Sequence, residues 1–464
     1  MLWIKTNYFR FKKIDEKDYL VTNKTWSYII LSKEDFKKFL QKDFTQTSDL
    51  FFQLQNKWFI WEEIVKAKEN PIGPRFHNLI ITLRCNHLCT YCHASVEPLD
   101  KIEFDMTQET AKKIVDTIFS STSPEVVLEF NWGEPLLNWK TLTFIVDYSK
   151  QKNLEHFKKV RYFLVTNTTL LTDEKLQYLI DNDFSISVSL DWLEMIHNSN
   201  RAYKFWNSYQ QTVEWIKKIN TAYKDNNREN KVTPMITITN KALPLYKEII
   251  DNLISLGMSE IFIRPLEPLW YGSKNMDSIW YKMSELKAFY YNFMNYIVEK
   301  NLEGNLLVEV NTLGYIRRVL AWRNNRNGCW LWPCWAWVKQ LTYNFNWEIY
   351  TCNEARALWK MWDKTFMLQS VTDDGKKTYQ SLYKQEKLQD VLSASIMKET
   401  SKFAAYIPYL WVCPVYNHKI NGAFISDDVH DIKLQVDVMI LDYIFDMIRT
   451  KKTFDLFNKW LSLR

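Results

Sequence analysis

Apolar and polar residues alternate along the central part of the chain with two distinct periods. Between residues 79 and 266, short segments with strand-like patterns are separated by longer segments in which apolar residues recur every three or four positions. The expected strands are LIITLRC, VVLEFN, RYFLVTN, SISVSL, MITITN and IFIRPL, and the helices between them include TQETAKKIVDTIF, DEKLQYLIDN and YKEIIDNLISLG. Repeated strand–helix units predict an α/β fold with a parallel sheet, closed into a barrel or partial barrel. We then expect the chemistry in the loops at the carboxyl ends of the strands.

The two flanking regions have different patterns from the centre. Residues 1–72 are expected to form a small module of three short strands, YFRFKKI, DYLVTN and SYIILS, followed by an amphipathic helix over 33–42. The polar, proline-containing segment KAKENPIGPR separates this module from the barrel, which is expected to span 73–305. Residues 306–464 contain four cysteines and few clear strands, and they are expected to form a third domain with a closing helix near 437–449.

Composition narrows the functional classes. The 464 residues are 47% hydrophobic and 25% charged with a net charge of +6, and without a dense basic run we expect no nucleic-acid partner. The longest apolar runs, such as VMILDYIF, are too short to span a bilayer, and the opening residues lack the apolar core of a signal peptide. We therefore expect a cytoplasmic protein with no membrane partner. In that compartment, seven cysteines favour metal or redox chemistry over disulfides.

Three of the cysteines lie on one short loop directly after the first expected barrel strand. LRCNHLCTYCHA places Cys85, Cys89 and Cys92 in a C-x3-C-x2-C spacing. Three thiolates at this spacing can bind three irons of a [4Fe–4S] cluster and leave the fourth iron open, as the reductive cleavage of S-adenosylmethionine (SAM) requires. The alternatives are three buried thiols or a zinc site in which His87 or His93 supplies the fourth ligand.

This loop resembles the signature of the radical SAM superfamily, C-x3-C-x-aromatic-C, with Tyr91 at the aromatic position. The resemblance implies a partial (β/α)6, TIM-like barrel with catalytic ligands Cys85, Cys89 and Cys92. A second family marker, Gly-Gly-Glu-Pro, corresponds to NWGEP after the second strand. In the family this stretch contacts the amino group of the SAM methionine, which implies a cofactor-binding role for Trp132, Gly133, Glu134 and Pro135.

Two further strand ends carry candidate cofactor ligands. SLDWLEMIHNSNR, after the fourth strand, resembles a family segment in which a serine and an arginine hold the SAM carboxylate. The matching residues here are Ser189 and Arg201. Asp191 and Asn167 are also expected at strand ends that face the site, with an ordinary cap or turn role as the alternative for each.

Tryptophan stands at several positions where this family has glycine. Trp132 and Trp192 occupy such positions in the two markers above. CWAWVKQLTYNFNWEIYTC resembles the CGAG…NGEIYTC segment of a SPASM-type auxiliary cluster domain, with Trp335, Trp337 and Trp347 at glycine positions. The turn of the expected hairpin NFNWEIY requires a positive φ at Trp347, where glycine is unstrained. The chain has 9 glycines and 21 tryptophans, whereas glycine alone is normally about 7% of residues.

Three interpretations of these tryptophans compete. They form an aromatic cluster around a cofactor, they mark a decayed enzyme, or the source organism reads UGA as glycine and the gene has been translated with UGA as tryptophan. We favour the third interpretation because it accounts for both the glycine deficit and the positions. Trp215, within the helical segment EWIKKI, is expected to be a genuine tryptophan.

The remaining cysteines suit a second, auxiliary site. Four thiolates in one domain can fully ligate a [4Fe–4S] cluster, and a four-thiolate zinc site is the alternative. The expected ligands are Cys329, Cys334, Cys352 and Cys413. SPASM domains usually carry two auxiliary clusters, but the other cysteine positions of the family fall here on Ser401, Ala404, Leu410 and a place near Ile432. The resemblance therefore implies a SPASM-like domain with one auxiliary cluster.

Segments from nearly the whole chain, including TLRCNHLCTYCHAS, FNWGEPLLN, IFIRPLEP and CPVYNHKINGAF, resemble the radical SAM maturase of the His-Xaa-Ser repeat peptide system. This resemblance implies a peptide-modifying enzyme that acts on a ribosomally made precursor and receives electrons from a donor such as flavodoxin or ferredoxin. The N-terminal module resembles leader-peptide recognition domains that bind by adding a strand. The alternatives are a maturase of another protein, such as a sulfatase, and a non-catalytic iron–sulfur subunit.

Overall fold

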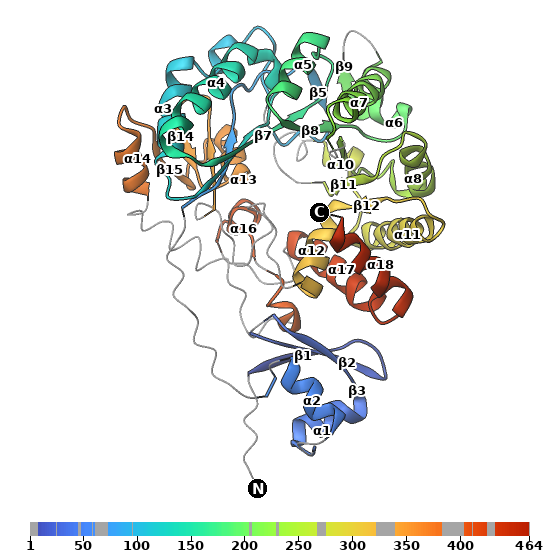
Figure 1. Ribbon diagram of the computed structural model, residues 1–464. Coiled ribbons are helices and arrows are strands. Elements are labelled where there is room, and N and C mark those ends of the chain that lie inside the picture. The colour runs from blue at the N-terminus through green and yellow to red at the C-terminus, as the bar shows by residue number, and fades with distance from the viewer. Residues whose placement is uncertain are drawn as a thin grey trace. The chain divides into compact units, whose positions relative to one another are not determined.

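The computed structural model describes residues 8–24, 26–44, 48–57, 59–60, 73–94, 96–203, 207–228, 232–266, 275–321, 339–382, 403–410, 412–424 and 432–463 (Figure 1). The chain separates into two compact units. One comprises Pro71–Asn311 and Ala336–Gln389 and is called the barrel unit below. The other comprises Met1–Asn70, Thr312–Trp335 and Asp390–Arg464.

A single sheet of ten strands forms the centre of the barrel unit, in the order β12-β11-β10-β8-β7-β6-β4-β13-β14-β15. The strands are β4 (Phe76–Leu79), β6 (Glu125–Phe130), β7 (Lys159–Thr166), β8 (Phe184–Ser189), β10 (Thr233–Thr237), β11 (Glu260–Arg264), β12 (Val308–Glu309), β13 (Gln340–Tyr343), β14 (Glu348–Tyr350) and β15 (Met367–Ser370). All neighbours from β12 to β13 are parallel, and β13, β14 and β15 form an antiparallel meander. The predicted parallel α/β architecture is therefore confirmed.

Helices cover the outer side of the curved run of strands (Figure 1). They are α3 (Gln108–Phe119), α4 (Trp139–His156), α5 (Asp173–Asp181), α7 (Ser208–Asp225), α8 (Tyr246–Ser255) and α11 (Met283–Leu302). Side-chain oxygens of Thr107, Thr172 and Asn207 accept hydrogen bonds from first-turn amides of α3, α5 and α7, so polar residues begin these helices as caps. Shorter elements on the loops are β5 (His87–Cys89), η1 (Ile102–Phe104), η2 (Pro135–Asn138), α6 (Glu194–Asn200), β9 (Arg201–Tyr203), η3 (Leu243–Leu245) and α10 (Met276–Ile279).

The first expected strand differs from the observed one. LIITLRC was expected to be a strand, but β4 ends at Leu79, where that segment begins. The following residues are buried. The Ile80 amide still donates to Tyr343 of β13 (2.9 Å), but the Leu83 amide donates to Phe104 on the loop (3.1 Å). An apolar run alone cannot distinguish a ladder strand from an extended buried segment.

Residues 336–389 add to the barrel sheet. β13 pairs in parallel with β4, and the remaining elements are α13 (Asn353–Ala357), η5 (Leu358–Met361) and α14 (Gly375–Leu382). A Cβ atom on Gly375 would lie 2.5 Å from a backbone carbon of Asp116, so α14 can approach α3 this closely only with glycine there. The predicted domain boundaries 1–72, 73–305 and 306–464 stay a prediction. The division of the chain into compact units groups residues 336–389 with 71–311.

The other unit contains the expected N-terminal meander. Strands β1 (Phe9–Lys13), β2 (Asp18–Asn23) and β3 (Tyr28–Ser32) are antiparallel, and α1 (Lys33–Gln41) and α2 (Asp49–Asn56) follow. One apolar cluster joins them through Val21, Ile29, Leu31, Phe36, Phe39, Phe51, Leu54, Phe59 and Ile60. The unit also holds most of α12 (Val310–Ala321), and η6 (Ala404–Tyr406), α16 (Pro414–Asn421), α17 (Ile432–Met447) and α18 (Lys451–Ser462). Among the described residues, no helix has the length and apolar character that crossing a bilayer requires.

Candidate active site

The three-cysteine loop lies between β4 and η1, at the carboxyl end of the barrel strands. β5 ends at Cys89, which pairs with Arg201 of β9, and the Thr90 amide donates to the Asn200 carbonyl (2.8 Å). The Cys85 amide donates to Glu97 (3.1 Å). The bonds to Asn200 and Arg201 connect the loop to a segment more than 100 residues later in the chain. They fix the backbone conformation of the loop.

None of these three cysteines is in a disulfide, and their surroundings suit a cationic partner. Burial, with a smaller contribution from neighbouring charges, raises the pKa of Cys85 well above its usual value, and burial raises the pKa of Cys89 to about 12. A buried thiolate is therefore unfavourable until a metal binds it. Among the described residues, no three His, Cys, Asp or Glu side chains are arranged around a single ion. A [4Fe–4S] cluster instead takes each thiolate on a different iron, and this donor set fits that group.

Gly133 holds the NWGEP segment against the cysteine loop. Its φ is 58°, and a Cβ atom there would lie 2.6 Å from the carbonyl oxygens of both Thr82 and Arg84. The adjacent Glu134 amide donates to the Arg84 carbonyl (2.8 Å). Only glycine allows the NWGEP backbone to lie this close to the Thr82 and Arg84 carbonyls. The segment is therefore held against Arg84, the residue before Cys85.

The Glu134 side chain is buried and oriented by three donors. Its oxygens accept hydrogen bonds from Thr166 Oγ1 (2.8 Å), the Asn167 amide (2.9 Å) and the Leu136 amide (3.2 Å). Burial raises its pKa to about 7 despite these donors. Pro135 begins η2 directly afterwards. The Glu134 carboxylate thus connects the carboxyl end of β6 to that of β7. A cationic ligand nearby would stabilise its negative charge.

Asn167 connects this carboxylate to the cysteine loop. Its Nδ2 donates to Asn86 Oδ1 (2.8 Å) and lies 4.0 Å from Cys85 Sγ. Sequence reasoning missed Asn86, whose own Nδ2 donates to Thr169 Oγ1 (2.7 Å), because no motif position distinguishes it from an ordinary loop residue. Ser189 is the last residue of β8 and is partly exposed.

Asp191 organises the opposite side of the loop. It is 1% exposed, accepts a hydrogen bond from the Tyr91 hydroxyl (2.5 Å) and forms an ion pair with Arg201 (3.4 Å). The Arg201 guanidinium lies 5.4 Å from the Tyr91 ring centroid and 3.9 Å from Cys89 Sγ. Asp191 thus contacts both Tyr91, which is part of the loop, and Arg201 of β9, and it positions these protein groups. A cofactor-binding role for the three residues stays a prediction.

Replacing Asp191 with alanine should destabilise the fold strongly. The change leaves the buried Arg201 guanidinium without its carboxylate, which typically costs about 3–5 kcal/mol. Urea unfolding of the apo chain measures the difference. The control is Asp173→Ala, which removes an exposed ion pair with Lys218 and should leave the midpoint almost unchanged. Equal midpoints for the two variants would contradict the assigned role.

The comparison with known families gives a match over the segment that contains the three-cysteine loop. The model of the radical SAM superfamily matches residues 79–242. Residues 79–242 thus resemble a radical SAM domain. The candidate site residues described above lie within that segment.

Relatives of this domain include an uncharacterized protein of Methanocaldococcus jannaschii, 32% identical over 190 residues, which are 41% of this chain and 62% of that protein. A radical SAM cyclopropyl synthase of Paramaledivibacter caminithermalis is 25% identical over 264 residues, 53% of each chain. A cysteine-type anaerobic sulfatase-maturating enzyme of Clostridium perfringens is 24% identical over 234 residues, 48% of this chain and 59% of that enzyme. The chain thus spans a little over half the length of these relatives.

Solved structures show the same fold. The structure of anSMEcpe with bound AdoMet has a TM-score of 0.64 at 16% identity and covers 83% of this chain and all of that one. Streptococcus suis SuiB bound to the precursor peptide SuiA has a TM-score of 0.55 at 11% identity, over 93% of this chain and all of that one. At these identities the likeness concerns the fold alone, and it confirms the predicted barrel type.

The structure describes two of the four expected auxiliary ligands. Cys352, buried, precedes α13 and its Sγ accepts a hydrogen bond from the Ala355 amide (3.4 Å). Cys413 precedes α16 in the other unit. Cys329 and Cys334 lie outside the described residues, so the auxiliary cluster stays a prediction.

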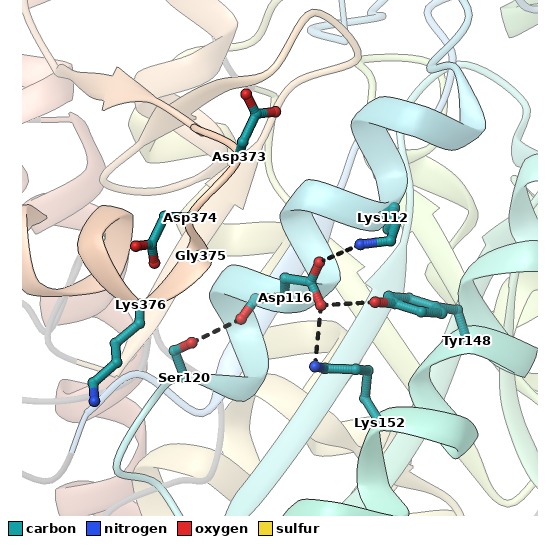
Figure 2. A pocket seen from close by; sticks show the side chains of 9 residues that line it. All are labelled: Lys112, Asp116, Ser120, Tyr148, Lys152, Asp373, Asp374, Gly375 and Lys376. Atoms are coloured by element: carbon teal, nitrogen blue, oxygen red, sulfur yellow. Dashed lines mark hydrogen bonds and ion pairs between the residues drawn. The ribbon is translucent and has the colours of Figure 1, made fainter.

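A surface pocket of about 400 Å³ lies away from the three-cysteine loop, on α3, α4 and the start of α14 (Figure 2). Its charges neutralise one another: Asp116 pairs with Lys112 (2.9 Å) and Lys152 (3.3 Å) and accepts from the Tyr148 hydroxyl (2.8 Å). These helices cover the outside of the sheet rather than the carboxyl ends of its strands. The pocket therefore has no part in the candidate site.

Among the described residues, four tryptophans have a left-handed backbone conformation in which glycine is unstrained. Trp26, Trp132, Trp347 and Trp362 have φ values of 67°, 68°, 66° and 61°. The positive φ expected at Trp347 is confirmed. Trp362 is 92% exposed, and Trp192 is buried with no hydrogen-bond partner for its Nε1 among the described residues. By contrast, Trp215 and Trp460 lie within α7 and α18.

Proposed function

We propose that the protein is a radical SAM enzyme that cleaves SAM to methionine and a 5′-deoxyadenosyl radical and uses the radical to modify a ribosomally made peptide with His-Xaa-Ser repeats. The observation that supports this proposal most strongly is that the cysteine loop contacts two groups of residues that the motifs assign to SAM binding. Gly133 and Asn167 fix it on one side, and Tyr91 and Arg201 on the other. When bound at Cys85, Cys89 and Cys92, the [4Fe–4S] cluster would supply the electron that splits the sulfonium.

The residues around the loop would hold the cofactor. Glu134 would accept the SAM ammonium, since a nearby cation favours the ionised form of a carboxyl whose pKa burial has raised to about 7. Ser189 and Arg201 would bind the SAM carboxylate. Arg201 is suited to this because it is cationic at the site while Asp191 fixes its orientation.

The peptide substrate is supported by the relatives and by the N-terminal meander. Cyclopropyl synthase and sulfatase-maturating enzyme are the names of two relatives, and SuiB has been solved with a precursor peptide. In the meander, β1 and β3 are both edge strands, and either could pair with an extended leader. A flavodoxin or ferredoxin would supply electrons in the cytoplasm, and one auxiliary [4Fe–4S] cluster would take an electron from the substrate radical.

A second candidate substrate is a sulfatase, which the Clostridium perfringens relative favours. The function can be tested on the full chain, reconstituted anaerobically with iron and sulfide and supplied with dithionite and SAM. We expect 5′-deoxyadenosine, and a mass change in a His-Xaa-Ser repeat precursor but not in a sulfatase-derived peptide. Cleavage with modification of only the sulfatase peptide would overturn the peptide assignment, and no 5′-deoxyadenosine under any condition would overturn the enzyme class.

We also propose that many of the tryptophans are glycines in the natural protein, read from UGA. The supporting observation is conformational. Trp26 and Trp362 match no family motif, yet they have the same left-handed backbone as Trp132 and Trp347. An L residue with a side chain is strained there, whereas glycine is not.

A further inference from the structure

Arg356 is a buried cation beside the cysteine loop that the cofactor-binding motifs leave unexplained. It lies in α13, one turn after Cys352, and its own amide donates to the Cys352 carbonyl (3.1 Å). Its side chain is 0% exposed. It reaches from the segment after β14 to the loop that follows β4, more than 260 residues earlier, within the barrel unit.

Within the described residues, two of the three guanidinium nitrogens of Arg356 donate hydrogen bonds and the third has no hydrogen-bond partner. Nε donates to Asn344 Oδ1 (2.9 Å), and Nη1 donates to the carbonyl of Ala94 (3.1 Å), two residues after Cys92. Nη2 is buried with no hydrogen-bond partner among the described residues. The group also lies 5.0 Å from the Trp132 ring centroid. These contacts fix the cation at the Cys92 end of the loop.

Among the described residues, Arg356 has no carboxylate in ion-pair contact, unlike Arg201, which has Asp191. The charge of Glu348 acts on Arg356, but that carboxylate pairs with Lys364 (2.6 Å). Burial lowers the pKa of Arg356 to about 9, with the charges of Tyr350, Glu348 and Cys92 opposing that effect. A buried charge without a partner costs several kcal/mol, so a fold that keeps one usually has an anion to bring to it.

The anion that fits is the cysteine-bound cluster. Three thiolates on a [4Fe–4S] core give a net negative charge, and reduction adds one more electron. In a low-dielectric site, a fixed cation nearby favours the more negative state. We propose that Arg356 is a positioning residue that balances the charge of the cluster held by Cys85, Cys89 and Cys92 and favours its reduced form. This inference rests on the proposed function, because it requires that cluster.

The test is a redox titration of the reconstituted full chain followed by electron paramagnetic resonance. The signal that changes when SAM is added reports the cluster on the three-cysteine loop. In Arg356→Gln, we expect the ratio of reduced to oxidised cluster at a fixed potential to fall about tenfold, which is 59 mV for a one-electron couple. Arg356→Lys keeps the charge and should stay within about threefold of the wild type. The control, Arg318→Gln, removes another 0% exposed arginine, from the other unit, and should not change the ratio.

The outcomes separate the inference from the proposed function. A wild-type chain that takes up no cluster overturns both. If the wild type and Arg356→Gln hold equal iron and titrate together, the inference is wrong while the proposed function stands. If Arg356→Gln loses iron, Arg356→Lys decides: a ratio close to the wild type supports the inference, and a tenfold fall overturns it.

Discussion

Replacing Cys89 with alanine should reduce 5′-deoxyadenosine formation to the background seen without protein. Cys89 ends β5, and its thiol lies beside Arg201, so alanine removes one of the three proposed iron ligands and leaves the backbone pairing with β9 in place. Loss of the cluster removes the electron source for the cleavage. We expect a fall of at least about 10³-fold, equivalent to about 4 kcal/mol of activation free energy. The measurement is product formation under dithionite, with iron content determined on the same samples.

Cys352→Ala is the matched control for this experiment. Cys352 lies in the barrel unit but away from the three-cysteine motif, and the proposal gives it an auxiliary role. This variant should still form 5′-deoxyadenosine and should fail to complete the modification of the peptide. Substantial SAM cleavage by Cys89→Ala, or its complete loss in Cys352→Ala, would show that the cysteines have been assigned to the wrong clusters.

Glycine substitutions at two tryptophans should change stability in opposite directions. Trp362 is 92% exposed with φ 61°, so Trp362→Gly loses little packing and relieves a left-handed conformation that costs an L residue about 1–2 kcal/mol. Trp460 is buried in α18, and Trp460→Gly should destabilise the fold by at least about 3–5 kcal/mol. Urea unfolding measures the free energy of unfolding of each variant, and the reference is the parent chain with tryptophan at both positions. Destabilisation by Trp362→Gly would contradict the glycine interpretation at that position.

The codons give an independent check of the same idea. We expect UGA at Trp26, Trp132, Trp347 and Trp362, and UGG at Trp460. Trp192 should join the first group, because its buried indole N–H has no partner. UGG at every position would instead favour a decayed enzyme.

The parallel core could be predicted from sequence because its strands are encoded locally. The ends of strands β6, β7, β8, β10 and β11 each lie within about three residues of the ends of the predicted segment, since each strand is a short apolar run between helical patterns. β13 could not be predicted as a partner of β4. Their pairing joins Gln340 to Phe76, and no local pattern encodes a contact between residues so far apart.

The residues of the candidate site likewise include some that the sequence could predict and others that it could not. Motif spacing pointed to the three cysteines, and the family resemblance pointed to Tyr91, Glu134 and Arg201, whose roles stay predictions. The sequence could not identify Asn86 or Arg356, whose importance comes only from distant partners. Nor could it show that Asp191 is engaged by Tyr91 and Arg201, because those contacts form only when the loops are brought together.

The pairing of β13 with β4 also affects the order in which the molecule can be completed during synthesis. β4 leads into the cysteine loop, and it pairs with β6 on one side and with β13 on the other. Until the ribosome has passed Tyr343, one side of β4 has unpaired backbone groups that could join another chain. The strand that leads into the cysteine loop can therefore be fully paired only after roughly three quarters of the polypeptide has been made.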